Sequence, residues 1–91
     1  MSAKAEISWK GKTAEGLKRE VYAQRIGGEW KFFVREKRYD HWETLDYPPL
    51  EDWLELLDAV RRRIARRRSR PEEESRVKKK ISELFPEAEL L

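Results

Sequence analysis

Residues 18–36, KREVYAQRIGGEWKFFVRE, decide the fold of this chain because they predict a β-hairpin. Two strand-like runs flank Gly27-Gly28, and glycine tolerates the positive φ that a two-residue hairpin turn requires. A two-residue turn fixes which residues of the two strands pair. A four-residue loop would give the same pairs, whereas a three-residue loop would shift the pairing by one residue. The expected pairs are Ile26 with Glu29, Arg25 with Trp30, Ala23 with Phe32, Tyr22 with Phe33, and Val21 with Val34.

This register divides the hairpin side chains between two faces, because successive side chains of a strand point to opposite sides. One face is apolar and is expected to be core. It carries Val21, Ala23, Trp30, Phe32 and Val34. The other face mixes aromatic, polar and charged side chains. It carries Tyr22, Gln24, Ile26, Lys31, Phe33 and Arg35.

Shorter strands are expected on both sides of the hairpin, at 7–10 and 42–45, with a turn at 11–16. Asp46-Tyr47-Pro48-Pro49 then breaks the sheet and starts a helix, since proline suits a first helical turn. Apolar residues recur at helical spacing through 49–68, which predicts a helix packed across the core face of the sheet.

A second helix is expected from Pro71 to Phe85. Ser69 and Glu72 have the spacing of a capping box, and Pro71 suits a first turn. The apolar stripe of this helix is thin, so the helix docks on the domain, docks on a partner or frays. The stripe consists of Val77, Ile81 and Leu84, which are the candidate partner-binding residues.

The predicted fold class is therefore α+β. It has an antiparallel β-meander of three to four strands packed against one long helix, and a shorter C-terminal helix. Residues 1–68 are expected to form the domain and residues 69–91 a helical extension. The expected core is Trp9, Val21, Ala23, Trp30, Phe32, Val34, Trp42, Leu50, Trp53, Leu54, Leu57, Val60 and Ile64.

The composition restricts the possible functions of the chain. Among 91 residues there is no cysteine, so disulfides and thiolate metal sites are excluded. No stretch approaches the roughly 20 apolar residues of a membrane span, and the start does not resemble a signal peptide. We expect a cytoplasmic protein that does not bind membranes.

Catalytic and metal-binding patterns are missing from the sequence. His41 lies near Asp40 and Glu43, but a single histidine cannot form a two-histidine metal site. Gly27-Gly28 lacks the context of a phosphate-binding loop, and no serine lies in a nucleophile-elbow pattern. We therefore expect no enzyme activity, no metal and no cofactor.

The mixed sheet face is a candidate binding surface. Rings of Tyr22 and Phe33 could stack on bases while cations meet phosphates, as in single-strand binders. The expected contacts are Tyr22, Gln24, Lys31, Phe33 and Arg35. The alternative is an ordinary cross-strand aromatic pair that stabilises the sheet, or a face covered by another copy or by the C-terminal helix.

Positive charge is concentrated late in the chain. Residues 1–60 carry 10 Lys/Arg and 12 Asp/Glu, a net −2, whereas residues 61–91 carry 11 and 6, a net +5. Seven arginines lie within residues 61–70. One interpretation is a solvated helix end that complements the helix dipole, with Asp58 pairing to Arg61 and Arg62. The other is a phosphate-contacting patch that includes Arg61, Arg62, Arg66 and Arg67.

In the order of its elements over about residues 7–68, the chain resembles the Pur-alpha and Whirly type of nucleic-acid-binding fold. That type has four antiparallel strands followed by a helix. The resemblance implies single-strand binding on the sheet surface, with Tyr22, Lys31, Phe33 and Arg35 as the corresponding residues. Members of that type assemble from paired units, whereas this chain has one.

Together these observations predict a non-catalytic domain that binds single-stranded nucleic acid, either DNA or RNA. The alternative is a protein-interaction module or homodimer that does not bind nucleic acid.

Overall fold

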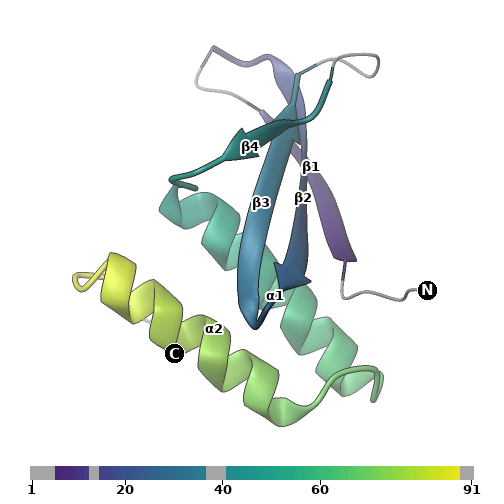
Figure 1. The fold of residues 1–91 in the computed structure, drawn as a ribbon, viewed down its shortest axis with the longest axis vertical. Helices are drawn as coiled ribbons and strands as arrows, with labels where there is room; N and C mark the ends of the chain where they lie inside the picture. The colour runs from purple at the N-terminus through teal and green to yellow at the C-terminus, as the bar shows by residue number, and fades with distance from the viewer. Residues whose placement is uncertain (1–5, 13–14, 37–40, 89–91) are drawn as a thin grey trace. The chain divides into compact units, whose positions relative to one another are not determined.

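In a computed structural model, the chain is described over residues 6–12, 15–36 and 41–88 (Figure 1). Four strands are followed by two helices, which confirms the α+β class. The strands are β1 (Glu6–Lys12), β2 (Lys18–Ile26), β3 (Glu29–Arg35) and β4 (Glu43–Leu45). The helices are α1 (Leu50–Ala65) and α2 (Pro71–Leu84). With 16 and 14 residues they are similar in length, so the predicted contrast between a long and a short helix is not found.

The chain forms two compact units, residues 1–47 with the sheet and residues 48–91 with both helices. All four strands lie in the first unit, and both helices lie in the second. The predicted packing of the first helix on the sheet, and the predicted boundary after residue 68, stay predictions.

The sheet is an antiparallel meander with strand order β1-β2-β3-β4. All five predicted pairs of the hairpin are confirmed. Gly27 and Gly28 have φ of 60° and 84°, so both occupy the left-handed region that the two-residue turn requires. The first strand is longer than predicted: Gly11 and Lys12 continue its pairing with β2 and are not part of a turn.

The apolar face of the sheet is buried at its centre. Ile7, Val21, Ala23 and Phe32 are buried, and the Trp9 ring meets Phe32 edge to face at a centroid distance of 6.0 Å. Trp9, Trp30 and Val34 are half-buried. Trp42 was predicted to be core, but it is 37% exposed and lies on the opposite face, where it contacts Tyr22.

Helix α1 begins after Pro49, the N-cap residue, and has Glu51 and Asp52 in its first turn. Its buried residues are Asp52, Trp53, Leu56, Leu57 and Val60. Leu54 was predicted to be core but is 40% exposed. Successive residues are about 100° apart around a helix, so Leu54 lies about 100° beyond Trp53, whereas Leu56 lies about 60° to its other side. The buried stripe is centred on the side of Leu56, which sequence analysis left out of the core.

Helix α2 begins at Pro71, as predicted, and ends at Leu84, one residue earlier than predicted. Its N-cap is Arg70, which makes no capping hydrogen bond with its side chain. The predicted capping box between Ser69 and Glu72 is therefore wrong. Arg70 has the extended backbone of an N-cap, and Ser69 lies one residue outside the helix.

The two helices contact each other within their unit, and an ion pair of 2.9 Å between Arg61 Nε and Glu74 Oε2 links them. Val77 and Ile81 are buried, while Leu84 is exposed. Two of the three residues in the thin apolar stripe of α2 are therefore buried within the chain. Leu84 is the member of this group that a partner could reach.

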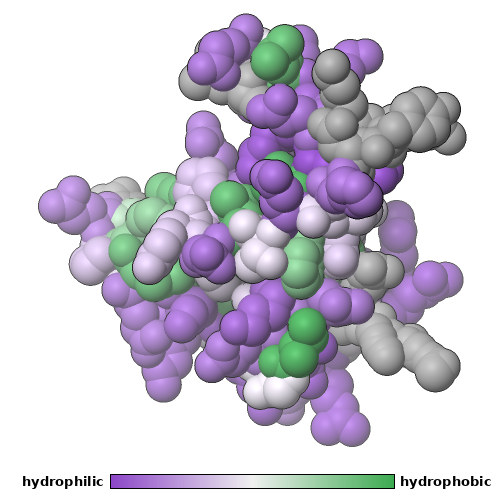
Figure 2. All heavy atoms as spheres, turned by 45° about the horizontal axis from the view of Figure 1, so that its top comes forward, coloured by the Kyte–Doolittle hydropathy of each residue, from purple (hydrophilic) through white to green (hydrophobic). Residues whose placement is uncertain are grey.

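Hydrophilic residues predominate on the face of the molecule drawn in Figure 2, and hydrophobic residues form small separate patches there. Among the residues that the structure describes, six large hydrophobic side chains are exposed: Leu17, Ile26, Trp42, Tyr47, Leu54 and Leu84. Over the described residues, neither helix combines the length and the apolar character that crossing a membrane requires.

Candidate nucleic-acid interface

Tyr22 and Phe33 form the centre of the mixed sheet face. They are directly opposite each other on β2 and β3, as predicted. Their rings stack with a centroid distance of 4.7 Å and an interplanar angle of 19°. Both residues are half-buried, so the pair stabilises the sheet and also leaves ring surface accessible.

Trp42 adds a third ring to this pair. Its ring lies 4.7 Å from that of Tyr22 at an interplanar angle of 88°, so the two rings form a corner. Thr44 pairs with Phe33 across β3 and β4, and Trp42 lies two residues before Thr44. The alternation of side chains therefore places Trp42 on the face of Phe33. Sequence analysis missed this because the connection between β3 and β4 left their register undefined.

Arg35 is held in place by two interactions on the same face. Its Nε donates to Glu20 Oε1 at 2.7 Å, and its guanidinium lies 4.3 Å from the centroid of the Trp42 ring. The two side chains of the ion pair are 22% and 27% exposed. A cation–π contact and a partly buried ion pair together fix the guanidinium. Glu20 offsets much of the charge that sequence analysis assigned to Arg35 for binding phosphate.

Gln24 and Lys31 lie opposite each other farther along the hairpin. Lys31 Nζ is 3.8 Å from Glu29 Oε1, and these side chains are 52% and 72% exposed. Exposed ion pairs of this kind contribute little to stability and exchange readily with solvent. Lys31 is therefore only weakly held by Glu29, and its contact with a nucleic acid stays a prediction.

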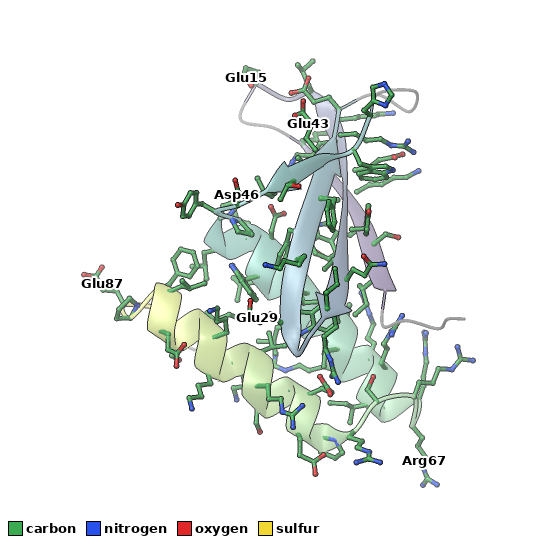
Figure 3. All side chains as sticks on the ribbon, viewed as in Figure 1. Glu15, Glu29, Glu43, Asp46, Arg67 and Glu87 are labelled. Carbon is green, nitrogen blue, oxygen red and sulfur yellow. The ribbon has the colours of Figure 1, made fainter. Side chains whose placement is uncertain are left out.

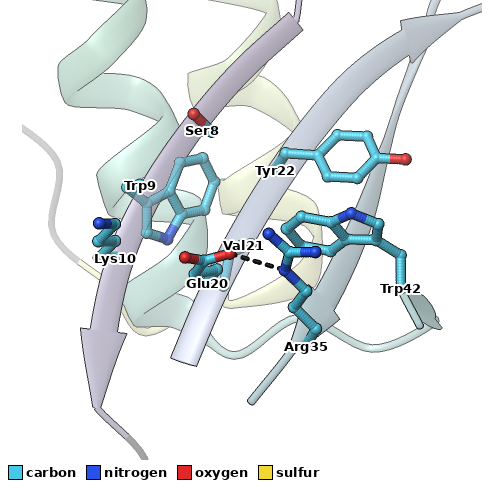
Figure 4. Close-up of a pocket in the computed structure, with 8 residues that line it drawn as sticks. All are labelled: Ser8, Trp9, Lys10, Glu20, Val21, Tyr22, Arg35 and Trp42. Carbon is cyan, nitrogen blue, oxygen red and sulfur yellow. Dashed lines mark hydrogen bonds and ion pairs between the residues drawn. The ribbon is translucent and has the colours of Figure 1, made fainter. Parts of the chain in front are cut away.

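A pocket of about 580 Å³ lies beside the aromatic corner, within the strand unit (Figure 4). Its lining residues come from β1, β2, β3 and the segment before β4. Those used below are Ser8, Lys10, Glu20, Tyr22, Arg35 and Trp42. The pocket thus combines aromatic rings with two cations and one carboxylate.

The second cationic region is the connection between α1 and α2. Helix α1 was predicted to run to Arg68 but ends at Ala65. Arg67 has a φ of 61°, its N–H donates to the carbonyl of Ile64 at 2.9 Å, and the N–H of Arg68 donates to the carbonyl of Arg63 at 2.8 Å. These two bonds form a Schellman motif, which closes the helix.

The arginines of residues 61–70 differ in their contacts. Arg61 pairs with Glu74, and Arg62 pairs with Asp58 at 3.0 Å, which confirms the predicted pairing of Asp58 with Arg62. Four arginines after the helix are exposed, and no hydrogen bond or ion pair joins their side chains to another described residue. They are Arg66, Arg67, Arg68 and Arg70. Figure 3 shows the Arg67 side chain extending away from the ribbon at this turn.

Sequence analysis assigned Arg61, Arg62, Arg66 and Arg67 to the interface. The structure shows that Arg61 forms a partly buried ion pair within the helical unit and Arg62 an exposed one. Arg68 and Arg70 resemble Arg66 and Arg67 in exposure. The run of seven arginines in the sequence located the cationic region. Which of these arginines form ion pairs depends on the position at which α1 ends.

His41 is exposed, and Asp40 lies outside the described residues. Over the described ranges, no group of three or more histidine, aspartate or glutamate side chains could hold a metal ion.

Comparison of the chain with known protein families, with curated proteins and with solved structures finds no match. The resemblance to the Pur-alpha and Whirly type rests on element order and stays a hypothesis.

Proposed function

We propose that this chain binds single-stranded nucleic acid and catalyses no reaction. The observation that carries the proposal is the group of exposed arginines after α1, named here the arginine turn: Arg66, Arg67, Arg68 and Arg70. Their side chains have no hydrogen-bond or ion-pair partner among the described residues. Complementing the dipole of α1 needs one or two cations, and Arg62 and Arg63 in its last turn already supply them.

The chemistry of the arginine turn suits phosphate. A guanidinium is always charged at neutral pH and presents several N–H donors in one plane, which matches two phosphate oxygens. Four such groups within five residues match the repeating charge of a nucleic-acid backbone. Neutralising phosphates releases counterions, so the affinity is expected to fall steeply as salt increases.

The mixed sheet face supports a preference for single strands. It offers ring surface on Tyr22, Phe33 and Trp42 and an exposed cation on Lys31. Bases stack on aromatic side chains when they are unpaired, at about 1–3 kcal/mol per base. A duplex keeps its bases stacked on each other and therefore gains nothing from these rings.

The proposal is tested by titrating the chain with labelled single-stranded and duplex oligonucleotides at two salt concentrations. We expect tighter binding of the single strand and a steep loss of affinity at the higher salt. Absence of binding at low salt would refute the proposed function. Equal affinity for both forms would leave the arginine turn as the interface and remove the role of the sheet face.

A matched pair of variants tests the arginine turn itself. The triple substitution R66Q/R67Q/R68Q removes three charges from the turn, and R76Q/K79Q/K80Q removes three charges from α2. Both variants have the same net charge, so a general electrostatic effect would weaken binding equally. We expect the first to lose most of its affinity and its salt dependence, and the second to bind nearly as the original chain does. Equal loss in both variants would contradict a localised site.

A further inference from the structure

The pocket beside the aromatic corner contains one carboxylate between two cations. Glu20 lies on β2, directly opposite Lys10 on β1 and Arg35 on β3. Arg35 Nε donates to Oε1 of this carboxylate at 2.7 Å. The second carboxylate oxygen of Glu20, Oε2, makes no hydrogen bond with another described residue. Figure 4 shows the Glu20 carboxylate among the side chains that line the pocket, with the Arg35 guanidinium in front of the Trp42 ring.

The walls of the pocket suit a flat ligand. The Tyr22 and Trp42 rings meet at 88°, so a planar ring stacked on one of them presents its edge to the other. The volume of about 580 Å³ lies within the range of small-molecule sites. Lys10, exposed on the edge strand, adds a positive charge at the rim that can meet a phosphate. A single unpaired base with its phosphate has this combination of planar ring, polar edge and negative charge.

The free oxygen of Glu20 determines which base edge fits, because a carboxylate accepts hydrogen bonds and donates none. Cytosine, adenine and guanine each carry an exocyclic amino group that can donate to it. The pairing edge of thymine or uracil presents one ring N–H between two carbonyl oxygens. That N–H can donate to Oε2 only with a carbonyl oxygen on each side of it, and the carboxylate repels both carbonyl oxygens, so this edge binds less favourably than an amino group.

We propose that this pocket takes one unpaired base, and that Glu20 selects bases with an exocyclic amino group over thymine and uracil. The inference rests on the proposed function and adds to it a base preference and the residue that sets it. Arg35 acts as a positioning residue, since its bond to Oε1 and its contact with Trp42 hold the carboxylate with Oε2 left for the ligand.

The test compares fluorescently labelled homopolymers of cytosine and thymine deoxynucleotides, of equal length and at one salt concentration. We expect the cytosine strand to bind about tenfold more tightly, the discrimination typical of one well-placed contact to a base edge. The decisive variant is Glu20→Gln. Glutamine keeps an oxygen that accepts from Arg35 and gains an N–H₂ group that donates to a thymine carbonyl. The preference for cytosine should therefore disappear or reverse.

Glu29→Gln is the matched control, because it removes the same charge from an exposed residue of β3 outside the pocket. It should keep the preference for cytosine. A merely structural role of Glu20 would change the affinity for both homopolymers by the same factor, and that outcome would overturn the inference. Thermal melts of both variants establish that they are folded.

The failure of this inference is distinguishable from failure of the proposed function. Equal and salt-dependent affinity for both homopolymers would overturn the base preference and leave nucleic-acid binding in place. If neither homopolymer binds, the proposed function fails, and the pocket is then tested alone with cytidine and thymidine monophosphates. A shift of the Trp42 indole resonance by the cytidine nucleotide alone would support the pocket, and no shift with either would overturn it.

Discussion

Replacing Arg67 with glycine should stabilise the chain, because the backbone conformation of this residue suits glycine. Arg67 has a φ of 61° and occupies the position of the Schellman motif at which helices most often have glycine. A side chain with a Cβ costs roughly 1–2 kcal/mol in the left-handed region. Glycine loses about 0.5–1 kcal/mol more backbone entropy on folding than other residues do. The net gain for Arg67→Gly is therefore about 0.5–1 kcal/mol.

The assay is thermal unfolding followed by circular dichroism at neutral pH. For a chain of this size the gain corresponds to a rise of roughly 2–8 °C in Tm. Arg67→Ala is the matched control, because it removes the same charge and keeps the Cβ that causes the strain. If the glycine variant is no more stable than the alanine variant, the strain at Arg67 is absent and the reasoning is refuted.

The remaining stability predictions concern the two helices. Arg70→Ser should stabilise α2 by about 1 kcal/mol, because serine at the N-cap accepts a hydrogen bond from the first turn that Arg70 does not; an unchanged melting temperature would contradict the assignment of this N-cap. Leu56→Ala should destabilise the chain by about 2–5 kcal/mol, since Leu56 is fully buried. Leu54→Ala should cost less than about 1 kcal/mol, and chemical denaturation of both variants measures the difference. Similar costs would mean that the buried stripe of α1 is misplaced.

The Arg67→Gly variant also connects stability to the proposed function. Arginine at this position lowers stability relative to glycine, and its side chain extends from the turn with no ion-pair partner among the described residues. Residues held in rarely populated backbone conformations are often located at functional sites. If the arginine turn binds phosphate, the glycine variant should unfold at a higher temperature and bind nucleic acid more weakly.

The hairpin was predictable from the sequence because its determinants are local. Gly27 and Gly28 set the turn, the turn set the register, and the register placed Tyr22 opposite Phe33. The apolar alternation that follows from this register identified Val21, Ala23 and Phe32 as buried. Both helix starts were predicted within one residue, because proline restricts the backbone at those positions whatever the rest of the chain does.

The features that the sequence left open depend on residues distant in the chain. Trp42 lies on the mixed sheet face because β4 pairs with β3 in one register out of several. Leu54 is exposed because packing sets the orientation of α1 about its axis. Glu20 became a candidate site residue through its bond to Arg35, fifteen residues away. Local rules fix turns, helix starts and the alternation of faces, whereas the composition of the pocket depends on how separate strands are brought together.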